Sequence, residues 1–359
     1  MPIRITGAAR RIEIARFGPK CFGAAVGALL ISALAIKAAP AQPSAAEFYK
    51  GKTVQFGVGY PPSGGFDLYT RTAARYMGKY IPGNPTVIVV NMPGASSFNY
   101  VRYIHDIATK DGTQFGMFDR GLIAKSILDP KTINVDFRDF SWIGSMNSEL
   151  GVCVLWNTKN IKSFADIMKY PGDVILAGTS KNGGGYVYSA ILQRMSPRNI
   201  KQVFGYTATG PMLVAAESGE VDGTCTIYSS LATQYPDMLR DKKLNVVVQY
   251  AEKRHPDLPD VATAYEIARS DNEKKVITFL TAAEAIGRPV IAPIGIPADR
   301  RDALRKAFLD TLNDPEFRAF AEKAKMDIDP VSGDAAAKII ADIAATPPEA
   351  VDLARKLLE

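Results

Sequence analysis

Residues 53–77 constrain the fold more than any other stretch, because they combine a strand, a tight turn and a helix start. Val54, Phe56 and Val58 alternate with smaller or polar residues, which is typical of a half-buried strand. Two prolines end the strand, and two glycines after them let the chain turn tightly with its backbone uncovered. Residues at helical spacing follow, which predicts a helix that begins between residues 63 and 66.

This strand–glycine–helix unit is a candidate anion-binding site. The first N–H groups of a helix have no partner within the helix, and its partial positive charge favours an anion by roughly 0.3–1 kcal/mol, or about 2 kcal/mol when partly buried. An ordinary βα turn would carry the same glycines, so that alternative stays open. The stretch is not a nucleotide loop, because it contains neither G-x-G-x-x-G nor a Walker-type G-K-[ST].

The N-terminus has the order of a secretory signal peptide. Basic residues precede an apolar run at 21–36, which is shorter than the roughly 18 residues of a membrane span, and Ala39-Pro40-Ala41 follows. We therefore predict export after cleavage near Ala41, by either the general secretory or the twin-arginine route. Of the 43 Lys and Arg and 37 Asp and Glu residues, six and one lie in residues 1–41. The remainder is almost neutral, so the basic composition does not indicate nucleic-acid binding.

The rest of the chain contains few residues suited to catalysis or metal binding. Cys153 and Cys225 remain after the predicted cleavage, as a disulfide or as two buried thiols. His105 and His255 are the only histidines, and neither has the spacing of a metal ligand. Hydrolase and metalloprotease motifs are missing as well. We expect a protein without cofactor or metal that is not an enzyme.

Strands alternate with helices along the chain, which predicts an α/β fold with largely parallel sheets. Because ligands bind beyond the carboxyl ends of such strands, the loops at 60–67, 91–97 and 119–121 are expected to meet at one edge. A strand at 174–177 leads into a second glycine-rich loop, 178–185, which precedes another helix. Two such helix starts in two halves of the chain suggest a ligand held between them.

Two crossovers divide the predicted fold. The chain leaves the first lobe before a strand that begins at Gly151 and returns in the segment 278–291. We assign residues 1–41 to the signal peptide, 47–150 plus 280–359 to lobe 1, and 151–279 to lobe 2.

A series of short motifs extends over nearly the whole mature chain. They are Tyr60-x-x-x-Gly64-Gly65-x-Asp67 with Arg71, Asn91-Met-Pro-Gly-Ala95, Asp111-Gly-Thr113, Asp136-Phe137 with Ile143, Gly178-Thr-Ser180 with Gly183, Tyr206 with Gly210, Gly219-Glu-Val-Asp222, Leu258-Pro-Asp-Val261 with Thr263 and Glu266, and Ala292-Pro-x-Gly-Ile-Pro297. Each is weak alone, but in this order they are specific. The chain resembles the extracytoplasmic solute receptors of the tripartite tricarboxylate transporters, the TctC or Bug family.

The resemblance implies a two-lobed periplasmic binding protein, type II-like, in which each lobe is a mixed, mostly parallel sheet flanked by helices. Such a protein closes on a carboxylated solute in the periplasm. It delivers the solute to the membrane subunits of a tripartite tricarboxylate-type transporter. We expect a monomer without a nucleic-acid partner.

We also predict a set of ligand-binding residues in both lobes, of which the resemblance implies those at 63–67 and at 179, 180, 182 and 183. They are Tyr60, Ser63, Gly64, Gly65, Phe66, Asp67, Asp119, Arg120, Thr179, Ser180, Lys181, Asn182, Gly183, Tyr206 and Thr207. Asp67 either meets a distal polar group of the ligand or stabilises its own helix start. Lys181 is either a solvated charge or a carboxylate partner, and Arg120 either a cation at the rim or part of the site.

The sequence departs from the family pattern in two of these loops. Lys181 and a Gly-Gly-Gly run replace the usual G-x-G-[ST], and Gly205-Tyr-Thr-Ala208 replaces the common P-Y-K-G. These departures leave the solute unnamed. Two alternative functions also remain: a periplasmic sensor subunit for a membrane kinase, and a secreted enzyme that uses Asp67 and Asp119 as a carboxylate pair.

Overall fold

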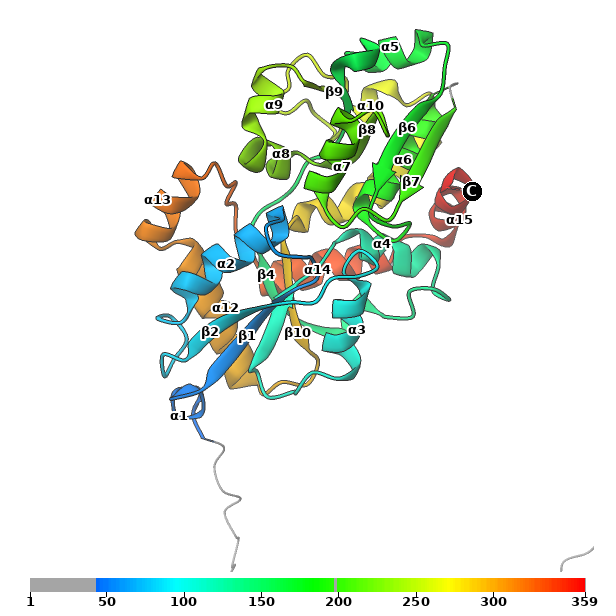
Figure 1. Cartoon of the computed structure of the whole chain (residues 1–359). Helices are drawn as coiled ribbons and strands as arrows, with labels where there is room; N and C mark the ends of the chain where they lie inside the picture. Colours follow the sequence, from blue (N-terminus) through cyan, green and yellow to red (C-terminus); the bar gives the residue numbers. More distant parts are fainter. Residues whose placement is uncertain (1–42, 197–198, 359) are drawn as a thin grey trace, which may run out of the picture. The chain divides into compact units, whose positions relative to one another are not determined.

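The computed structural model describes residues 43–196 and 199–358 of the 359-residue chain. The predicted signal peptide lies outside the described residues. Two separate sheets organise the described part (Figure 1). No helix in residues 43–196 or 199–358 combines the length and the apolar character needed to cross a membrane.

The first lobe, as we call it here, is built on a six-stranded sheet with the order β11-β4-β10-β3-β1-β2. β1 pairs in parallel with β2 and β3, whereas β10 is antiparallel to both β3 and β4. The strands are β1 (Thr53–Val58), β2 (Thr86–Asn91), β3 (Gln114–Met117), β4 (Phe140–Ser145), β10 (Pro289–Pro293) and β11 (Val331–Ser332).

The second lobe is built on a five-stranded sheet with the order β7-β6-β8-β5-β9. β6 pairs in parallel with β7 and β8, and β5 is antiparallel to β8 and β9. Both sheets are therefore mixed. Two strand pairs in each are parallel, whereas β10 and β5, which lie next to the crossovers, are antiparallel to both of their neighbours. The strands are β5 (Gly151–Trp156), β6 (Val174–Gly178), β7 (Ile200–Phe204), β8 (Gly223–Ile227) and β9 (Leu244–Tyr250).

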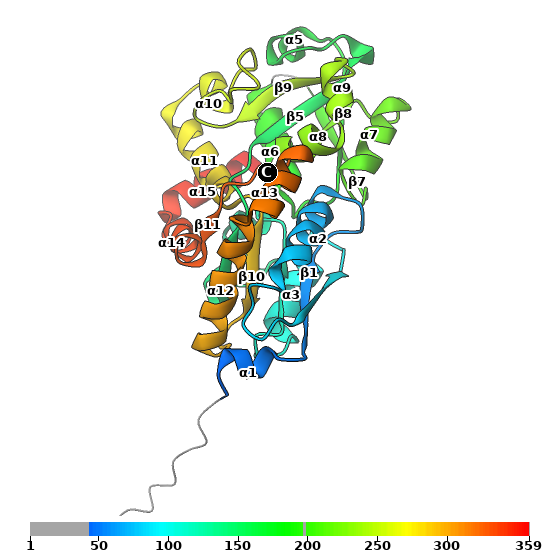
Figure 2. The same cartoon turned by 90° about the vertical axis from the view of Figure 1, so that its left-hand side faces the viewer.

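Helices flank both sheets, and α2 lies beside α12 in both views (Figures 1 and 2). Those of the first lobe are α1 (Ala45–Tyr49), α2 (Gly65–Met77), α3 (Phe98–Asp106), α4 (Gly121–Leu128), η1 (Phe137–Asp139), α12 (Ala298–Leu312), α13 (Pro315–Lys323) and α14 (Gly333–Ala344). Those of the second lobe are η2 (Asn157–Lys159), α5 (Phe164–Lys169), α6 (Gly184–Met195), α7 (Thr209–Glu217), α8 (Tyr228–Gln234), α9 (Pro236–Arg240) and α10 (Ala264–Ile267). α11 (Asp271–Thr281), η3 (Ala282–Ile286) and α15 (Pro348–Leu358) lie at the return crossover and the C-terminus.

The buried face of α2 only partly matches the one that the sequence pattern predicts. Of Leu68, Thr72, Ala73 and Tyr76, which are at helical spacing in the sequence, Leu68 and Tyr76 are half-buried, whereas Phe66, Tyr69, Ala73 and Met77 pack with β1 and α12 in one core. A second core continues from α3 and α14 of the first lobe into α6 of the second, and α15 packs against both α4 and α6. The two lobes therefore share one apolar core.

Two chain segments connect the lobes and run side by side. Backbone bonds join them, from Gly287 N to Asn147 O (2.8 Å), from Glu149 N to Glu284 O (2.8 Å) and from Met146 N to Arg288 O (3.2 Å). The strands of each sheet fall within the residue ranges assigned to each lobe from the sequence. The lobe boundaries themselves stay a prediction.

Cys153 and Cys225 form a disulfide, one of the two arrangements that the sequence left open. They are directly opposite each other on the antiparallel strands β5 and β8. A disulfide between cysteines this far apart in the sequence typically stabilises a fold by about 2–4 kcal/mol, because it restricts the unfolded chain. The covalent link therefore lies in the middle of the second sheet, next to the candidate site.

Candidate functional site

The three first-lobe loops meet at one edge of the sheet, as the strand-end rule predicts. Asn91 Nδ2 donates to Tyr60 O (2.9 Å) and to Asp67 Oδ1 (2.8 Å). The Tyr60 hydroxyl donates to Asp119 Oδ2 (2.7 Å), and Asp119 N donates to the Ser97 hydroxyl (3.1 Å). The loops that follow β1, β2 and β3 are thus joined by hydrogen bonds.

A cavity of about 60 Å³ lies between this edge and the second lobe. Its wall contains residues from the ends of strands and the starts of helices in both lobes. They are Tyr60, Gly64, Gly65, Phe66, Asp119, Arg120, Gly178, Thr179, Gly184, Gly185, Tyr188, Ala208, Thr209, Met212, Cys225, Thr226, Ile227 and Ser230.

Among the described residues, five helices begin at this cavity: α2 and α4 from the first lobe, and α6, α7 and α8 from the second. α2 and α6 each have a glycine at the N-cap, so the N-cap residue itself provides no side-chain bond, and at α6 the first N–H, of Gly184, donates to Asp119 Oδ1 (3.4 Å). Helix starts that point at one space make its potential positive, which favours a bound anion.

The structure brings six of the predicted first-lobe residues to the cavity wall: Tyr60, Gly64, Gly65, Phe66, Asp119 and Arg120. Gly65 packs closely against the second lobe, because a Cβ there would lie 2.3 Å from the Ser230 hydroxyl, which would have to rotate away. The predicted residue Ser63 is not part of the wall. Its backbone has a φ of 70°, and its N–H donates to Asp67 (2.9 Å).

The structure does not bring Asp67 to the cavity wall. Both of its oxygens are already bonded, since Oδ2 accepts from Ser63 N and from Arg71 Nε (2.8 Å), and Oδ1 accepts from Asn91. Burial opposes the charge of Asp67, but these donors together hold its pKa below the usual value. Its position fits the alternative in which Asp67 stabilises its own helix start.

Of the predicted second-lobe residues, Thr179 lines the cavity. The hydroxyls of Ser180 and Thr179 also connect the two lobes, because they hydrogen-bond to the Ser96 hydroxyl of the first lobe (2.8 and 2.7 Å, respectively). Asn182 N donates back to the Ser180 hydroxyl (3.1 Å), and Lys181 is exposed. The structure does not bring Lys181 or Asn182 to the wall.

The remaining predicted positions are spread around the site. Gly183 precedes α6 and packs closely against the first lobe, because a Cβ there would lie 2.8 Å from the Ser96 hydroxyl and 2.9 Å from Asp119 Oδ2. Tyr206 and Thr207 are outside the wall, and the Tyr206 hydroxyl donates to Glu220 (2.6 Å).

Arg120 lines the cavity but is already paired. It is buried, its Nε donates to Glu284 Oε2 (2.7 Å), and its Nη2 donates to the Tyr188 hydroxyl (2.6 Å). Burial alone would lower the pKa of Arg120, but the negative charge of Glu284 raises it above the usual value. Burial raises the pKa of Glu284 above its usual value, although the positive charge of Arg120 acts in the opposite direction. This pair ties the first lobe to the return crossover.

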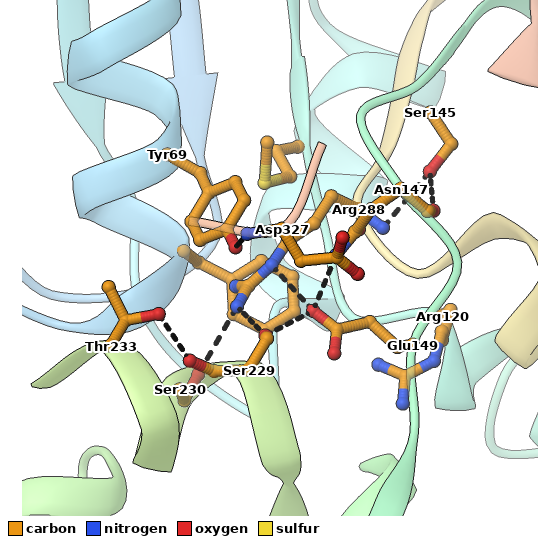
Figure 3. A network of polar contacts seen from close by, with 12 residues as sticks. Tyr69, Arg120, Ser145, Asn147, Glu149, Ser229, Ser230, Thr233, Arg288 and Asp327 are labelled. Atoms are coloured by element: carbon orange, nitrogen blue, oxygen red, sulfur yellow. Dashed lines mark hydrogen bonds and ion pairs between the residues drawn. The ribbon is translucent and has the colours of Figure 1, made fainter. Parts of the chain in front are cut away.

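A second buried ion pair, between Arg288 and Glu149, contacts Ser230 of the cavity wall (Figure 3). Arg288 Nε lies 3.0 Å from Glu149 Oε1, although it is not aligned for a hydrogen bond. Its Nη2 donates to the hydroxyls of Ser229 (2.9 Å) and Ser230 (3.2 Å) on α8. Arg288 therefore connects both crossover segments to a helix that lines the cavity.

The sequence interpretation missed the second-lobe residues at the starts of α7 and α8, including Thr209, Thr226 and Ser230, and also Tyr188 on α6. The strand-end rule that identified the first-lobe loops would have found the first three, because each follows or ends a strand of the sheet. In the described part of the chain, no group of three His, Cys, Asp or Glu residues is arranged to hold a metal ion.

Comparisons with known proteins give structural matches but no sequence match. No protein-family model and no curated protein sequence matches the chain. The periplasmic binding protein BugD has a TM-score of 0.68 at 20% identity, over 86% of this chain and 98% of its own. MatC (Rpa3494) from Rhodopseudomonas palustris, with bound malate, has a TM-score of 0.66 at 20% identity over 86% and 99%. R. palustris Rpa4515, with adipate, has a TM-score of 0.67 at 18% identity over 84% and 97%.

The chain therefore has the two-lobed fold of the periplasmic binding proteins, as the sequence predicted. Within that class, the likeness to BugD supports the Bug and TctC resemblance that the motifs carry.

Proposed function

We propose that this protein is an extracytoplasmic solute receptor of the TctC or Bug family. In this proposal it captures a carboxylate in the cavity between its lobes and delivers it to the membrane subunits of a tripartite tricarboxylate-type transporter. It works in the periplasm as a monomer, without cofactor and without catalysis. The observation that carries the proposal is the start of five helices from two lobes at one cavity.

Binding in this proposal requires the lobes to separate and close again. The cavity of about 60 Å³ is smaller than the roughly 150 Å³ that holds one benzene molecule in an engineered protein core. A dicarboxylate therefore enters a more open cleft and first meets the start of α2 at Gly64, Gly65 and Phe66. The second lobe then adds the start of α6 and the hydroxyls of Thr179 and Thr209. Exclusion of water strengthens each of these charge-assisted bonds.

The solute class is testable with the mature protein. We expect that a panel of mono- and dicarboxylates, aliphatic and aromatic, contains compounds that raise the melting temperature and bind in a calorimeter. The uncharged amides of the same compounds should bind at least about tenfold more weakly, because they lack the charge that the helix starts favour. Binding of the amides as tightly as the acids would contradict an anion site. No binding by any carboxylate would overturn the proposed function.

A further inference from the structure

Asp119 is a buried carboxylate at the cavity wall, with 6% of its surface exposed. Neutral groups hold it in place. Oδ2 accepts from the Tyr60 hydroxyl (2.7 Å), and Oδ1 accepts from Gly121 N (2.8 Å) and, more distantly, from Gly184 N (3.4 Å). Within residues 43–196 and 199–358, no lysine or arginine forms an ion pair with it. A buried acid without a basic partner is unusual, because burial of an unpaired charge is costly.

Neither arginine at the cavity forms an ion pair with Asp119, although the charges of Asp119 and the adjacent Arg120 attract each other. Arg120 lines the cavity, but its guanidinium pairs with Glu284. Arg288 contacts Ser230 of the cavity wall and pairs with Glu149. Each arginine is matched by a glutamate, and Asp119 remains as an acid without a base.

When the lobes separate, Asp119 remains fixed on the first lobe and faces the open cleft. Two of its donors, Tyr60 and Gly121, belong to the first lobe, and only Gly184 N comes from the second. Opening therefore removes the longest of the three bonds and leaves the carboxylate fixed on the first lobe. Because a carboxylate can accept about four hydrogen bonds, Oδ1 then has room for a donor from a solute.

We propose that Asp119 selects solutes that carry a hydrogen-bond donor, an ammonium or a hydroxyl group, next to the carboxylate. This inference rests on the proposed function and names its substrate class as short amino or hydroxy acids. The start of α2 and Asp119 share the wall of one cavity, and Tyr60 both stacks on Phe66 of α2 and donates to Asp119, so the carbon next to a solute carboxylate at the start of α2 is within reach of Asp119. A donor on that carbon pairs with Asp119, whereas a second carboxylate there meets a like charge at short range. The small volume of the cavity favours the same compact class.

The test uses two series of acids that share a carbon skeleton: propionate, lactate and alanine, and succinate, malate and aspartate. Calorimetry with wild-type protein is expected to show that an amino or hydroxy acid binds at least about tenfold tighter than its unsubstituted parent. In Asp119→Asn, the amide oxygen can still accept from Gly121 N, so the site keeps its shape but loses its charge. The preference for the amino acid over its parent should fall at least about tenfold.

Three results would overturn the inference. The first is a wild-type protein that binds succinate or propionate as tightly as the substituted acids. A wild-type protein that binds none of the six acids, although it binds another carboxylate of the wider panel, counts as the same result. The second is an Asp119→Asn variant that keeps the full preference. The third is an Asp119→Asn variant that binds all the acids more tightly, because Asp119 would then compete with solute carboxylates for the start of α6. All three leave the carboxylate receptor intact, whereas the absence of any carboxylate binding refutes the receptor itself.

Asp111→Asn is the matched control. Its carboxylate also accepts a backbone N–H, from Thr113 (2.8 Å), and it belongs to the same lobe but lies outside the cavity wall. It should retain the wild-type preference within about twofold. An equal loss in both variants would mean that the change reflects stability, not selection, and would also overturn the inference.

Discussion

A Gly121→Ala variant is expected to lose at least about 100-fold in solute affinity while both lobes stay folded. Gly121 is the first residue of α4, and a Cβ there would lie 2.2 Å from Gly184 N and 2.7 Å from Gly184 Cα. These atoms are backbone of the other lobe, so they cannot rotate aside as the end of a side chain can. The variant therefore excludes the closed form, and the solute keeps only the contacts of one lobe.

The matched control is Gly172→Ala, in the second lobe and outside the cavity wall. A Cβ at Gly172 would have only the half-buried Tyr170 side chain near it, at 3.2 Å, and that ring can shift slightly. We expect its affinity to stay within about threefold of wild type. Calorimetry measures both affinities, and small-angle scattering with and without solute measures closure. If Gly121→Ala binds and compacts like the control, closure at this contact does not contribute to binding.

Much of the fold could be predicted because it depends on short-range patterns. The alternation of Val54, Phe56 and Val58 and the glycines at 64 and 65 indicate β1 and the start of α2, and the structure has both there. The meeting of the three first-lobe loops also follows from a general rule, since parallel strands end at the same edge of a sheet. These inferences need no knowledge of how distant parts of the chain pack.

The site was harder to predict because its surface is defined by contacts between the lobes. Asp67 lies in the first turn of α2, where a ligand-binding acid could also lie, and only the positions of Arg71 and Asn91 show that its oxygens are occupied. Ser96 belongs to a loop with no obvious chemistry, yet it bonds to two hydroxyls of the second lobe. Gly121 looks like an ordinary helix start until Gly184 is found against it.

The role of Arg288, a charged residue, could not be predicted from the sequence either. It is the only charged residue between Ala285 and Ala298 in an otherwise mostly apolar stretch, which is an unusual setting for an arginine. Its partners, Glu149 and two serines of α8, come from parts of the chain about 60 to 140 residues away, so no local pattern connects them. Both Phe66 and Tyr69 place their rings against the guanidinium, at 4.5 and 4.2 Å from Cζ.

Arg288→Met is expected to lower the free energy of unfolding by about 3–5 kcal/mol. Methionine fills much of the same volume between the two aromatic rings, so the main loss is the positive charge. Glu149, whose side chain is 1% exposed, then remains buried with only the Ser229 hydroxyl (2.5 Å) and Asn147 Nδ2 (3.2 Å) as donors. Urea unfolding of the two proteins measures the difference.

Two further variants separate the buried pair from a general effect of losing an arginine. Arg102 forms an exposed pair with Asp106, and Arg102→Met should cost less than about 1 kcal/mol. Adding Glu149→Leu to Arg288→Met should recover part of the lost stability, because the unpaired buried charge is then removed. If Arg288→Met is no less stable than Arg102→Met, the ion pair does not hold the crossovers together.

Because Ser230 both accepts from Arg288 and lines the cavity, loss of this pair should also weaken solute binding in the molecules that remain folded.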